Sequence, residues 1–521
     1  MSCIILIILF YVNIISADIY TLPILTLHTG VPVIQRVAAL YKTNEIPTLI
    51  SDLNGEGSYI NFDMKFTAVG HIPPAGSKIE VSVLQATTLD DLGYYDELEY
   101  STSYCCTQEL LNRAINNNIP GCNQQLLNQL IIKPSAQYQQ SFFATFNGGS
   151  NIATMIPSGA TYNVQSTGEH LMITSNCNPA LTSDVEVTGT TTWHNTYGYL
   201  LGRLYNYLPF YIVLVTYYCV ITLIWLLLLI KHRDYVVTVQ YYITLLLVWS
   251  CIEHGINFLD YNQANIYGVR NIGVVYDAII LTGLRLTASR LLVVCVSLGY
   301  GSVRAELSKS TIAKLAVSGI IYCTSEVVLD YMTRESVLNN SNDQRAADQL
   351  RALVSIPVLV LNVIFYYWIF TSLQNTIQLL RDNSQYAKLR VYNLFLASLI
   401  ISLLLSFGFA FWQTWFLATG QLGLHFSLVF LIDDGFFTII YTLIISAIAL
   451  LWKPSRDSKS YGYAEIGNDE QLDDYDKLEL AEPSVTQRNN NSSYTPSSNN
   501  GNGYSTTHQT PQPHFTIDDE L

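Results

Sequence analysis

The sequence predicts a multi-pass α-helical membrane protein, in which an N-terminal β-sandwich domain precedes a bundle of seven helices. Two observations predict this fold class. Seven apolar stretches lie between residues 208 and 452, and each is long enough to cross a bilayer core of about 30 Å as a helix. Before them lies a polar region, residues 18–207, with strand-like patterns. Its length is sufficient for one domain with its own core.

The seven spans are expected to be helices, because backbone polar groups must be paired within the helix when lipid surrounds it. Strands of about ten alternating residues, which are typical of membrane barrels, are absent from this part of the sequence. The predicted spans are residues 208–230, 236–258, 272–298, 310–332, 352–375, 391–413 and 425–452.

Residues 1–17 are predicted to be a cleaved signal peptide. They contain a short apolar core, Ile4 to Tyr11, and end in the small residues Ser16 and Ala17. The core is too short to span a membrane, and no basic segment follows it. The alternative is an N-terminal strand or helix buried in the domain.

The basic residues predict the orientation of the bundle, because cytosolic loops are enriched in Lys and Arg. A cleaved signal would leave residues 18–207 lumenal, and seven crossings would then place the C-terminus in the cytosol. Eleven basic residues flank the spans on the predicted cytosolic side: Lys231, Arg233, Arg304, Lys309, Lys314, Arg381, Lys388, Arg390, Lys453, Arg456 and Lys459. Five lie near the membrane on the other side: Arg203, Arg270, Arg334, Arg345 and Arg351.

Composition excludes one class of partner and suggests the redox environment. Half of the residues are hydrophobic, 13% are charged and the net charge is −14, so no nucleic-acid partner is expected. The lumenal region contains Cys105, Cys106, Cys122 and Cys177, which predict two disulfides in an oxidising compartment. Three pairings are possible, and the adjacent Cys105 and Cys106 are expected to have different partners.

The lumenal region shows alternating strand patterns separated by turn signals such as Asn54-Gly55. The clearest predicted strands are Tyr59–Ala68, Lys78–Gln85, His170–Ser175 and Asp184–Thr192, whereas Thr107–Leu130 is more helical or loop-like. These patterns favour an antiparallel sandwich.

Ionisable residues inside the spans predict a polar cavity, because such groups usually face the interior of a bundle or a hydrated space. They are Glu253 and His254 in the second span, Asp277 and Arg285 in the third, Glu326 in the fourth, and Asp433 and Asp434 in the seventh. The acids all fall in the lumenal half when each span is followed in its direction, and Arg285 lies near mid-depth. The alternative is a structural network of ion pairs, with His254 as a packing residue.

No enzyme is expected. The sequence contains no zinc-protease motif, nucleophile elbow or phosphate loop, and no cofactor or metal is indicated. Asp277 and Asp434 lack the Gly-x-Gly-Asp context of an intramembrane aspartic protease.

The tail, residues 453–521, is predicted to be a disordered cytosolic segment. Residues 465–482 are acidic, and 488–513 are rich in Asn, Ser, Thr, Gly and Gln. Two Tyr-x-x-apolar patterns, Tyr463 to Ile466 and Tyr475 to Leu478, suggest binding to a clathrin adaptor. Asn339 is the one sequon that the predicted topology makes accessible to glycosylation.

Five ordered motifs resemble those of the GOLD-domain seven-transmembrane family, also called the lung seven-transmembrane receptor family. They are Ser175-Asn176-Cys177-Asn178-Pro179, Asn195 to Leu200 with Leu208 to Tyr211, Val296 to Arg304, Asp433-Asp434-Gly435-Phe436 and Trp452-Lys453-Pro454-Ser455. The third and fifth are most similar to the Golgi branch of the transmembrane protein 87 type. The chain differs by having Ala305 where the family usually has Pro, and Lys453 where it has Arg.

The resemblance implies a GOLD-like β-sandwich on a seven-helix bundle in the Golgi apparatus, with cycling through endosomes or the plasma membrane. It also implies a role in endosome-to-Golgi retrieval or Golgi-to-surface transport, with membrane lipids and a lumenal cargo or ligand as partners. A cation channel or pH-sensing protein that uses the intramembrane acids is an alternative hypothesis. A G-protein-coupled receptor is another, although Gly299-Tyr300-Gly301 stands where such receptors have Asp-Arg-Tyr.

Overall fold

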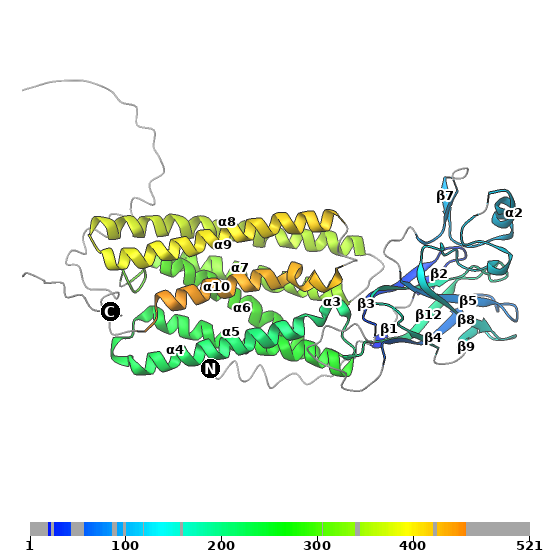
Figure 1. The fold of residues 1–521 in the computed structure, drawn as a ribbon, viewed down its shortest axis with the longest axis horizontal. Helices are drawn as coiled ribbons and strands as arrows, with labels where there is room; N and C mark the ends of the chain where they lie inside the picture. Colours follow the sequence, from blue (N-terminus) through cyan, green and yellow to red (C-terminus); the bar gives the residue numbers. More distant parts are fainter. Residues whose placement is uncertain are drawn as a thin grey trace, which may run out of the picture. The chain divides into compact units, whose positions relative to one another are not determined.

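The computed structural model describes ten stretches of the chain. They are residues 19–21, 25–42, 57–85, 91–96, 100–117, 119–156, 160–304, 306–338, 344–419 and 425–454 (Figure 1). The predicted signal peptide (1–17), the sequon at Asn339 and the tail patterns at Tyr463, Ile466, Tyr475 and Leu478 lie outside these residues.

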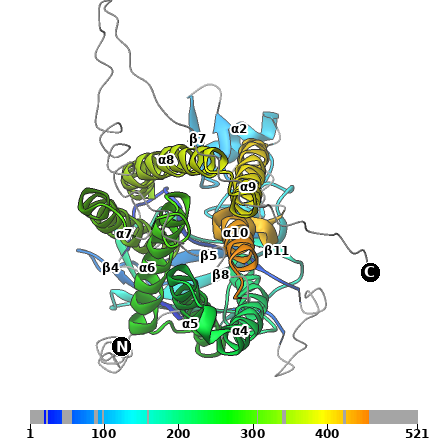
Figure 2. The same cartoon turned by 90° about the vertical axis from the view of Figure 1, so that its left-hand side faces the viewer.

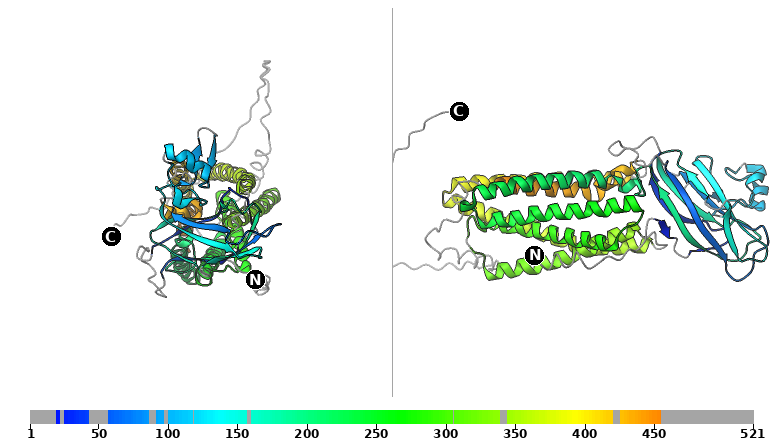
Figure 3. Two further views of the ribbon diagram at one scale, coloured as in Figure 1. Left: turned by 90° about the vertical axis from the view of Figure 1, so that its right-hand side faces the viewer. Right: turned by 90° about the horizontal axis from the view of Figure 1, so that it is seen from below.

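The N-terminal domain is built on one antiparallel sheet, whose strands curve over a common core (Figure 3). The strands are β1 (Ile19–Thr21), β2 (Leu25–Leu27), β3 (Val33–Leu40), β4 (Tyr59–Ala68), β5 (Lys78–Gln85), β8 (Gln137–Phe146), β9 (Ile152–Ile156), β10 (Thr161–Asn163), β11 (Gly168–Ser175) and β12 (Val185–His194). Their main order is β1-β12-β4-β9-β8-β5-β11-β3, with β10 and β2 paired at its side. This nearly closed sheet confirms the predicted fold class.

Buried and more exposed side chains alternate along β4, which explains why this strand forms where it is predicted. Ile60, Phe62, Met64 and Phe66 are all buried, while the residues between them are more exposed. Because side chains alternate between the faces of a strand, one face of β4 enters the core. The strand then pairs with β12 along its whole length, from Tyr59 opposite His194 to Ala68 opposite Val185.

Of two disulfides in the segment between β5 and β8, one ties it to the sheet and the other closes a loop within it. This segment carries β6 (Tyr94–Asp96), β7 (Ser101–Ser103), α2 (Gln108–Asn117) and a 3-10 turn, Gln124–Leu126. Cys105 is bonded to Cys177 beside β11, and Cys106 is bonded to Cys122, so the two adjacent cysteines have different partners.

A buried carboxylate adds a further tie between this segment and the sheet. Glu80 of β5 accepts hydrogen bonds from the Leu130 backbone N–H at 2.7 Å and from the Ser141 hydroxyl at 2.8 Å. Hydrogen bonds to a charged acceptor are roughly twice as strong as neutral ones, so Glu80 fixes the segment at the sheet.

Seven segments of the bundle are long and apolar enough to cross a membrane. The helices are α4 (Tyr207–Lys231), α5 (Thr238–Tyr267), α6 (Ile272–Ser297), α7 (Lys309–Leu338), α8 (Gln344–Asp382), α9 (Tyr386–Ala418) and α10 (Phe436–Leu451), with a short α3 (Gly202–Tyr205) before α4 (Figure 2). The head end of the bundle is defined as the end at which α4 begins, and the tail end as the end at which α10 stops. The helices alternate in direction between these ends.

Two helical segments differ from the predicted spans in ways that matter for the site. α5 continues to Tyr267, nine residues past the predicted boundary at 258, because the polar side chains in this extension are buried against other residues rather than exposed to lipid. The seventh span is not one α-helix: a 3-10 turn (Phe426–Leu428) and a π-helical segment (Leu431–Gly435) precede α10.

The segment after β12 packs on the head end of α5. The Asn265 side-chain amide donates to the Tyr197 carbonyl at 2.8 Å, and the Asn265 carbonyl accepts from the Tyr199 N–H at 2.9 Å. Gly198 has φ +135°, and a Cβ there would lie 2.3 Å from the Asn265 carbonyl oxygen. Only glycine allows so close an approach of the two backbones.

Candidate functional site

A cavity of about 600 Å³ opens among the helices in the head half of the bundle. It is called the head cavity below. Its ionisable lining residues come from four parts of the bundle: Arg270 between α5 and α6, Glu326, Asp330 and Arg334 of α7, Arg351 of α8, and Asp433 and Asp434 of the π-helical segment. Tyr207, Tyr211 and Tyr261 line it as well.

A buried aspartate holds two of these arginines. Asp260 of α5 is fully buried, and its two carboxylate oxygens contact the guanidinium of Arg270, one of them at 3.1 Å from Nε. Arg334 Nη1 lies 3.5 Å from the same carboxylate. Because a buried charge is costly without a partner, Asp260 makes it possible for two arginines to lie at this depth.

Arg334 links this group of charges to a second one. Its Nε donates to Asp330 at 3.0 Å, one turn earlier on α7, and its Nη2 donates to the Asn257 side-chain oxygen at 3.0 Å. Asn257 then donates to Glu253 at 2.9 Å, one turn earlier on α5. A continuous series of polar contacts therefore joins α5 and α7 from the head end to mid-depth.

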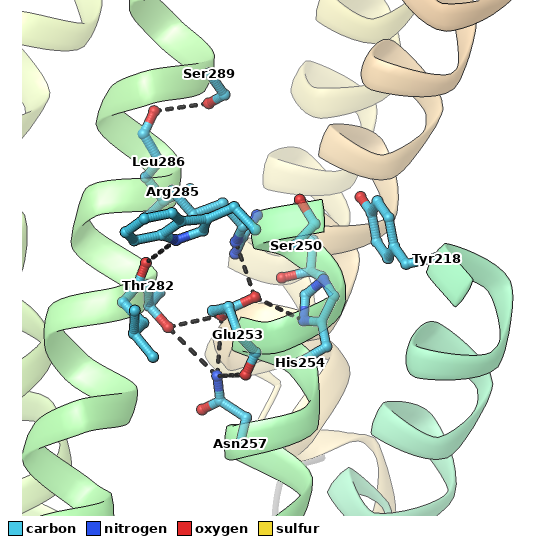
Figure 4. Close-up of polar contacts among 12 residues, drawn as sticks. Tyr218, Ser250, Glu253, His254, Asn257, Thr282, Arg285, Leu286 and Ser289 are labelled. Atoms are coloured by element: carbon cyan, nitrogen blue, oxygen red, sulfur yellow. Dashed lines mark hydrogen bonds and ion pairs between the residues drawn. The ribbon is translucent and has the colours of Figure 1, made fainter. Parts of the chain in front are cut away.

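Glu253 is the centre of a closed cluster beside the cavity (Figure 4). One oxygen accepts hydrogen bonds from the Thr282 hydroxyl at 2.7 Å and from Asn257. The other lies 3.0 Å from Arg285 Nε and 2.9 Å from His254 Nδ1. Glu253, His254 and Arg285 are each at most 2% exposed and do not line the head cavity, whereas Thr282 contributes to both.

Aromatic rings enclose the other charged and titratable members of this cluster. The Arg285 guanidinium lies 4.4 Å from the ring centroid of Tyr441, which is a cation–π geometry. The His254 ring lies 5.1 Å from that of Tyr218 and 6.0 Å from that of Tyr211, both on α4. The cluster therefore ties α4, α5, α6 and α10 together.

Asp433 and Asp434 differ from the other acids because they face open space. Both side chains are exposed and line the cavity. Among the described residues, no arginine or lysine nitrogen lies within 4 Å of either carboxylate. The Thr438 hydroxyl donates to Asp434 at 3.2 Å. These two carboxylates are available to a ligand.

The π-helical segment explains how two consecutive aspartates reach one cavity. Successive side chains of an α-helix diverge by about 100°, but a π turn contains an extra residue and widens the helix locally. Such turns are frequent at functional sites. Gly435 completes the segment, and a Cβ there would lie 3.0 Å from the Phe430 carbonyl oxygen.

The structure divides the predicted site residues into three groups. Glu326, Asp433 and Asp434 line the head cavity, and Glu253, His254 and Arg285 form the neighbouring cluster. Asp277 does not line the head cavity, although it lies on the same helix as Thr282, which does. Thr282 is five positions after Asp277, so at about 100° per residue the two side chains point about 140° apart.

Sequence reasoning missed much of the charge in the site. In the sequence, Arg270, Arg334 and Arg351 indicate only the orientation of the bundle, and Asp260 lies beyond the predicted end of its span. Asp330 falls inside the predicted fourth span and was overlooked. The sequence does contain one indication of this charge: Asp330 and Arg334 are four residues apart, a spacing that favours an ion pair on one helix face.

Metal binding has no support in the described part of the chain, where no group of three or more potential ligands comes together. Among the four free cysteines in the described ranges, Cys219 of α4 and Cys251 of α5 are neighbours with their sulfurs 2.9 Å apart.

Comparison with known proteins gives a family for the membrane domain. Residues 206–459 match the family model described as GOST, seven transmembrane domain. The chain is 25% identical to human Transmembrane protein 87A over 309 residues, which cover 58% of this chain and 51% of that protein. Mouse Transmembrane protein 87B is 25% identical over 293 residues, covering 56% and 50%.

A fungal protein matches to a similar extent. The chain is 25% identical to Membrane protein PTM1 of Saccharomyces cerevisiae over 289 residues, which cover 53% of each protein. The matched part thus spans about half the length of each of these relatives.

Proposed function

Because the chain belongs to the GOST seven-transmembrane family, with relatives of the transmembrane protein 87 type, we propose that it acts in membrane traffic of the Golgi apparatus. In this proposal the protein works without catalysis, in endosome-to-Golgi retrieval or Golgi-to-surface transport. The head cavity binds the ligand to which this transport responds. The observation that carries the proposal is the pair of cavity-facing carboxylates, Asp433 and Asp434, in a membrane domain.

The size and charge of the head cavity favour a small ligand with a basic group. A volume of about 600 Å³ falls within the range of small-molecule sites. Arg270 and Arg334 are held by Asp260 and Asp330, which leaves Arg351 as the lining arginine without an ion pair to a described residue. Glu326, Asp433 and Asp434 outnumber it, so the space attracts a positive group.

In this proposal, the N-terminal domain binds cargo and the C-terminal tail binds a clathrin adaptor. The curved sheet of the N-terminal domain offers a folded surface to lumenal cargo, on the predicted topology. The Tyr463 and Tyr475 patterns in the tail are proposed to bind a clathrin adaptor. This arrangement would connect a lumenal signal to cytosolic sorting machinery.

Cation conduction is the second candidate, and the same carboxylates favour it. A cation inside the head cavity would be close to the carboxylates of Asp433 and Asp434. A cation path through the whole bundle is disfavoured, because the Arg285 guanidinium lies at mid-depth between Glu253 and Tyr441. Purified protein in liposomes would test this candidate: conductance that Asp434→Ala abolishes would support it, and no conductance would reject it.

The proposed role in traffic is tested by locating a fluorescent fusion and following secreted and recycling cargo in cells that lack the protein. We expect Golgi localisation and slower retrieval or surface delivery, restored by the wild-type chain. A fusion that stays at the plasma membrane, together with unchanged cargo transport in the deletion, would contradict the proposal.

A further inference from the structure

A second pocket, of about 750 Å³, lies in the tail half of the bundle. It is called the tail pocket below. Helices α5 and α7 lie on either side of α6 (Figure 2). The outer face of α6 forms the floor of the pocket, and the beginnings of α5 and α7 form its walls. Leu245, Leu284 and Ile312 line it and are 62%, 39% and 52% exposed, so the pocket opens sideways to the bilayer.

The pocket is apolar along its length and polar at one end. From Leu284 to Val296, its floor follows thirteen residues of α6, whose first and last Cα atoms are about 18 Å apart along the helix axis. The Tyr242 and Tyr300 rings, with centroids 6.4 Å apart, and the Glu306 side chain line the end near the membrane surface. A ligand that fits must therefore be a long apolar body with one polar end.

The turn after α6 holds Tyr300 at this end. Gly299 and Gly301 on either side of it have φ +81° and +74°, a conformation that other residues adopt only at a cost. The Tyr300 N–H donates to the Cys295 carbonyl at 3.1 Å, and the Gly301 N–H donates to the Arg304 carbonyl at 2.8 Å. The Gly-Tyr-Gly motif thus fixes the position of Tyr300 at the polar end of the pocket.

The walls are suited to a flat, rigid molecule. The Trp249 indole N–H donates to the Leu281 carbonyl at 3.2 Å, so the ring is fixed and its N–H is already paired. Ala288, a small and exposed residue of α6, leaves space on the floor between the larger side chains. A fused-ring hydrocarbon loses less conformational freedom in such a slot than a flexible acyl chain does.

We propose that the tail pocket binds a sterol, with its hydroxyl group between Tyr300, Tyr242 and Glu306. The charge at the polar end favours an uncharged hydroxyl over a phospholipid headgroup, because the Glu306 carboxylate would repel a phosphate. The hydroxyl would lie near the membrane surface, since Tyr300 follows the end of α6 by three residues. Leu298, Tyr300 and Arg304 also fit a short pattern proposed for sterol contact, which is weak by itself.

Photolabelling of the full-length protein in phosphatidylcholine nanodiscs tests this proposal. The probe is a cholesterol analogue that carries a diazirine, and labelled peptides are mapped by mass spectrometry. We expect saturable labelling in the first turns of α5 and α7 and the last turns of α6, removed by excess cholesterol. Tyr300→Phe keeps the ring but loses one hydrogen bond, and should weaken binding about fivefold.

A matched pair of variants separates pocket binding from contact with bulk lipid. Ala288→Leu should abolish saturable labelling by filling the floor. Ala316→Leu makes the same change on an exposed part of α7 outside the pocket, and should have no effect. Labelling that excess cholesterol does not reduce, or that Ala288→Leu leaves unchanged, would overturn the proposal. Equal competition by a diacylglycerol would also overturn it, because the site would then not select a sterol.

Discussion

The head cavity and the tail pocket lie in one helix bundle and have similar volumes, but their walls have opposite chemistry. Seven of the residues that line the head cavity are ionisable Arg, Asp or Glu, whereas Glu306 is the one such residue in the tail pocket. A charge inside the membrane domain requires a partner or a hydrated space, while an apolar wall requires only close packing. The head cavity is therefore part of a network across helices, and the tail pocket is a local gap between them.

This difference predicts which substitutions lower the stability of the protein most. Removing one charge from the network leaves its former partners buried and unpaired. The free energy of unfolding therefore falls by more than the lost contact contributed. Some carboxylates face the cavity and are not paired with a cation. Removing one of these leaves no buried, unpaired charge behind.

Asp260→Asn should have the largest effect. It leaves Arg270 and Arg334 without their shared countercharge, and breaking a buried pair typically costs about 3–5 kcal/mol. We expect a strongly lowered melting temperature and poor yield of the purified protein. Asp277→Asn is the matched control, since no ion pair to a described residue is lost there; equal damage in both variants would contradict the contrast.

A buried histidine of the N-terminal domain provides a pH-dependent comparison outside the bundle. Burial lowers the pKa of His170 to about 4, although its hydrogen bond to the Gly168 carbonyl acts in the opposite direction. The unfolded chain therefore takes up a proton near pH 6.5, whereas the folded chain does so only near pH 4. Stability is lost as the pH falls between these values, by about 2 kcal/mol at pH 5.

The measurement is thermal unfolding of the full-length protein from pH 7 to pH 5, compared with His170→Phe. This variant keeps a ring but cannot titrate, so its unfolding temperature should fall less steeply with pH. Identical slopes for the two proteins would show that His170 does not contribute.

Gly301→Ala should have a smaller effect, confined to the tail half. A non-glycine residue in the left-handed conformation costs roughly 1–2 kcal/mol, and a Cβ there would lie 2.9 Å from Val239. We expect reduced stability together with weaker sterol labelling, because Tyr300 loses its fixed position. Gly408→Ala on α9 places its Cβ in open space and should change neither measurement.

The double variant Asp433→Asn, Asp434→Asn should have the smallest effect on stability. No described ion pair is lost, so the melting temperature should stay close to that of the wild type, as for most substitutions away from buried networks. A loss comparable to that of Asp260→Asn would mean that these carboxylates are structural.

The sequence was sufficient to predict the elements whose patterns are local. Strand β4 alternates clearly between Tyr59 and Ala68, and both of its boundaries were predicted as observed. The spans follow from long apolar runs, since lipid requires them. The π-helical segment Leu431–Gly435 could not be predicted, because a single extra residue in a turn leaves no periodic signal.

The site was only partly predictable, because the position of a residue along a span gives its depth but not its direction. Asp277 lies in the same half of its span as the acids that line the cavity. Its side chain nevertheless points away from the face of α6 that carries Thr282. Arg334 and Asp260 become site residues only when α5 and α7 are placed side by side. Partners on different helices are tertiary information that one sequence does not contain.

The central claim, that the head cavity carries the function in traffic, is tested most directly by complementation. Cells that lack the protein receive the wild type, the Ala316→Leu control or the double variant Asp433→Asn, Asp434→Asn, and cargo transport is measured in each. We predict that the double variant reaches the Golgi at wild-type levels but does not restore transport, whereas the other two restore it. Full restoration by the double variant would contradict the claim.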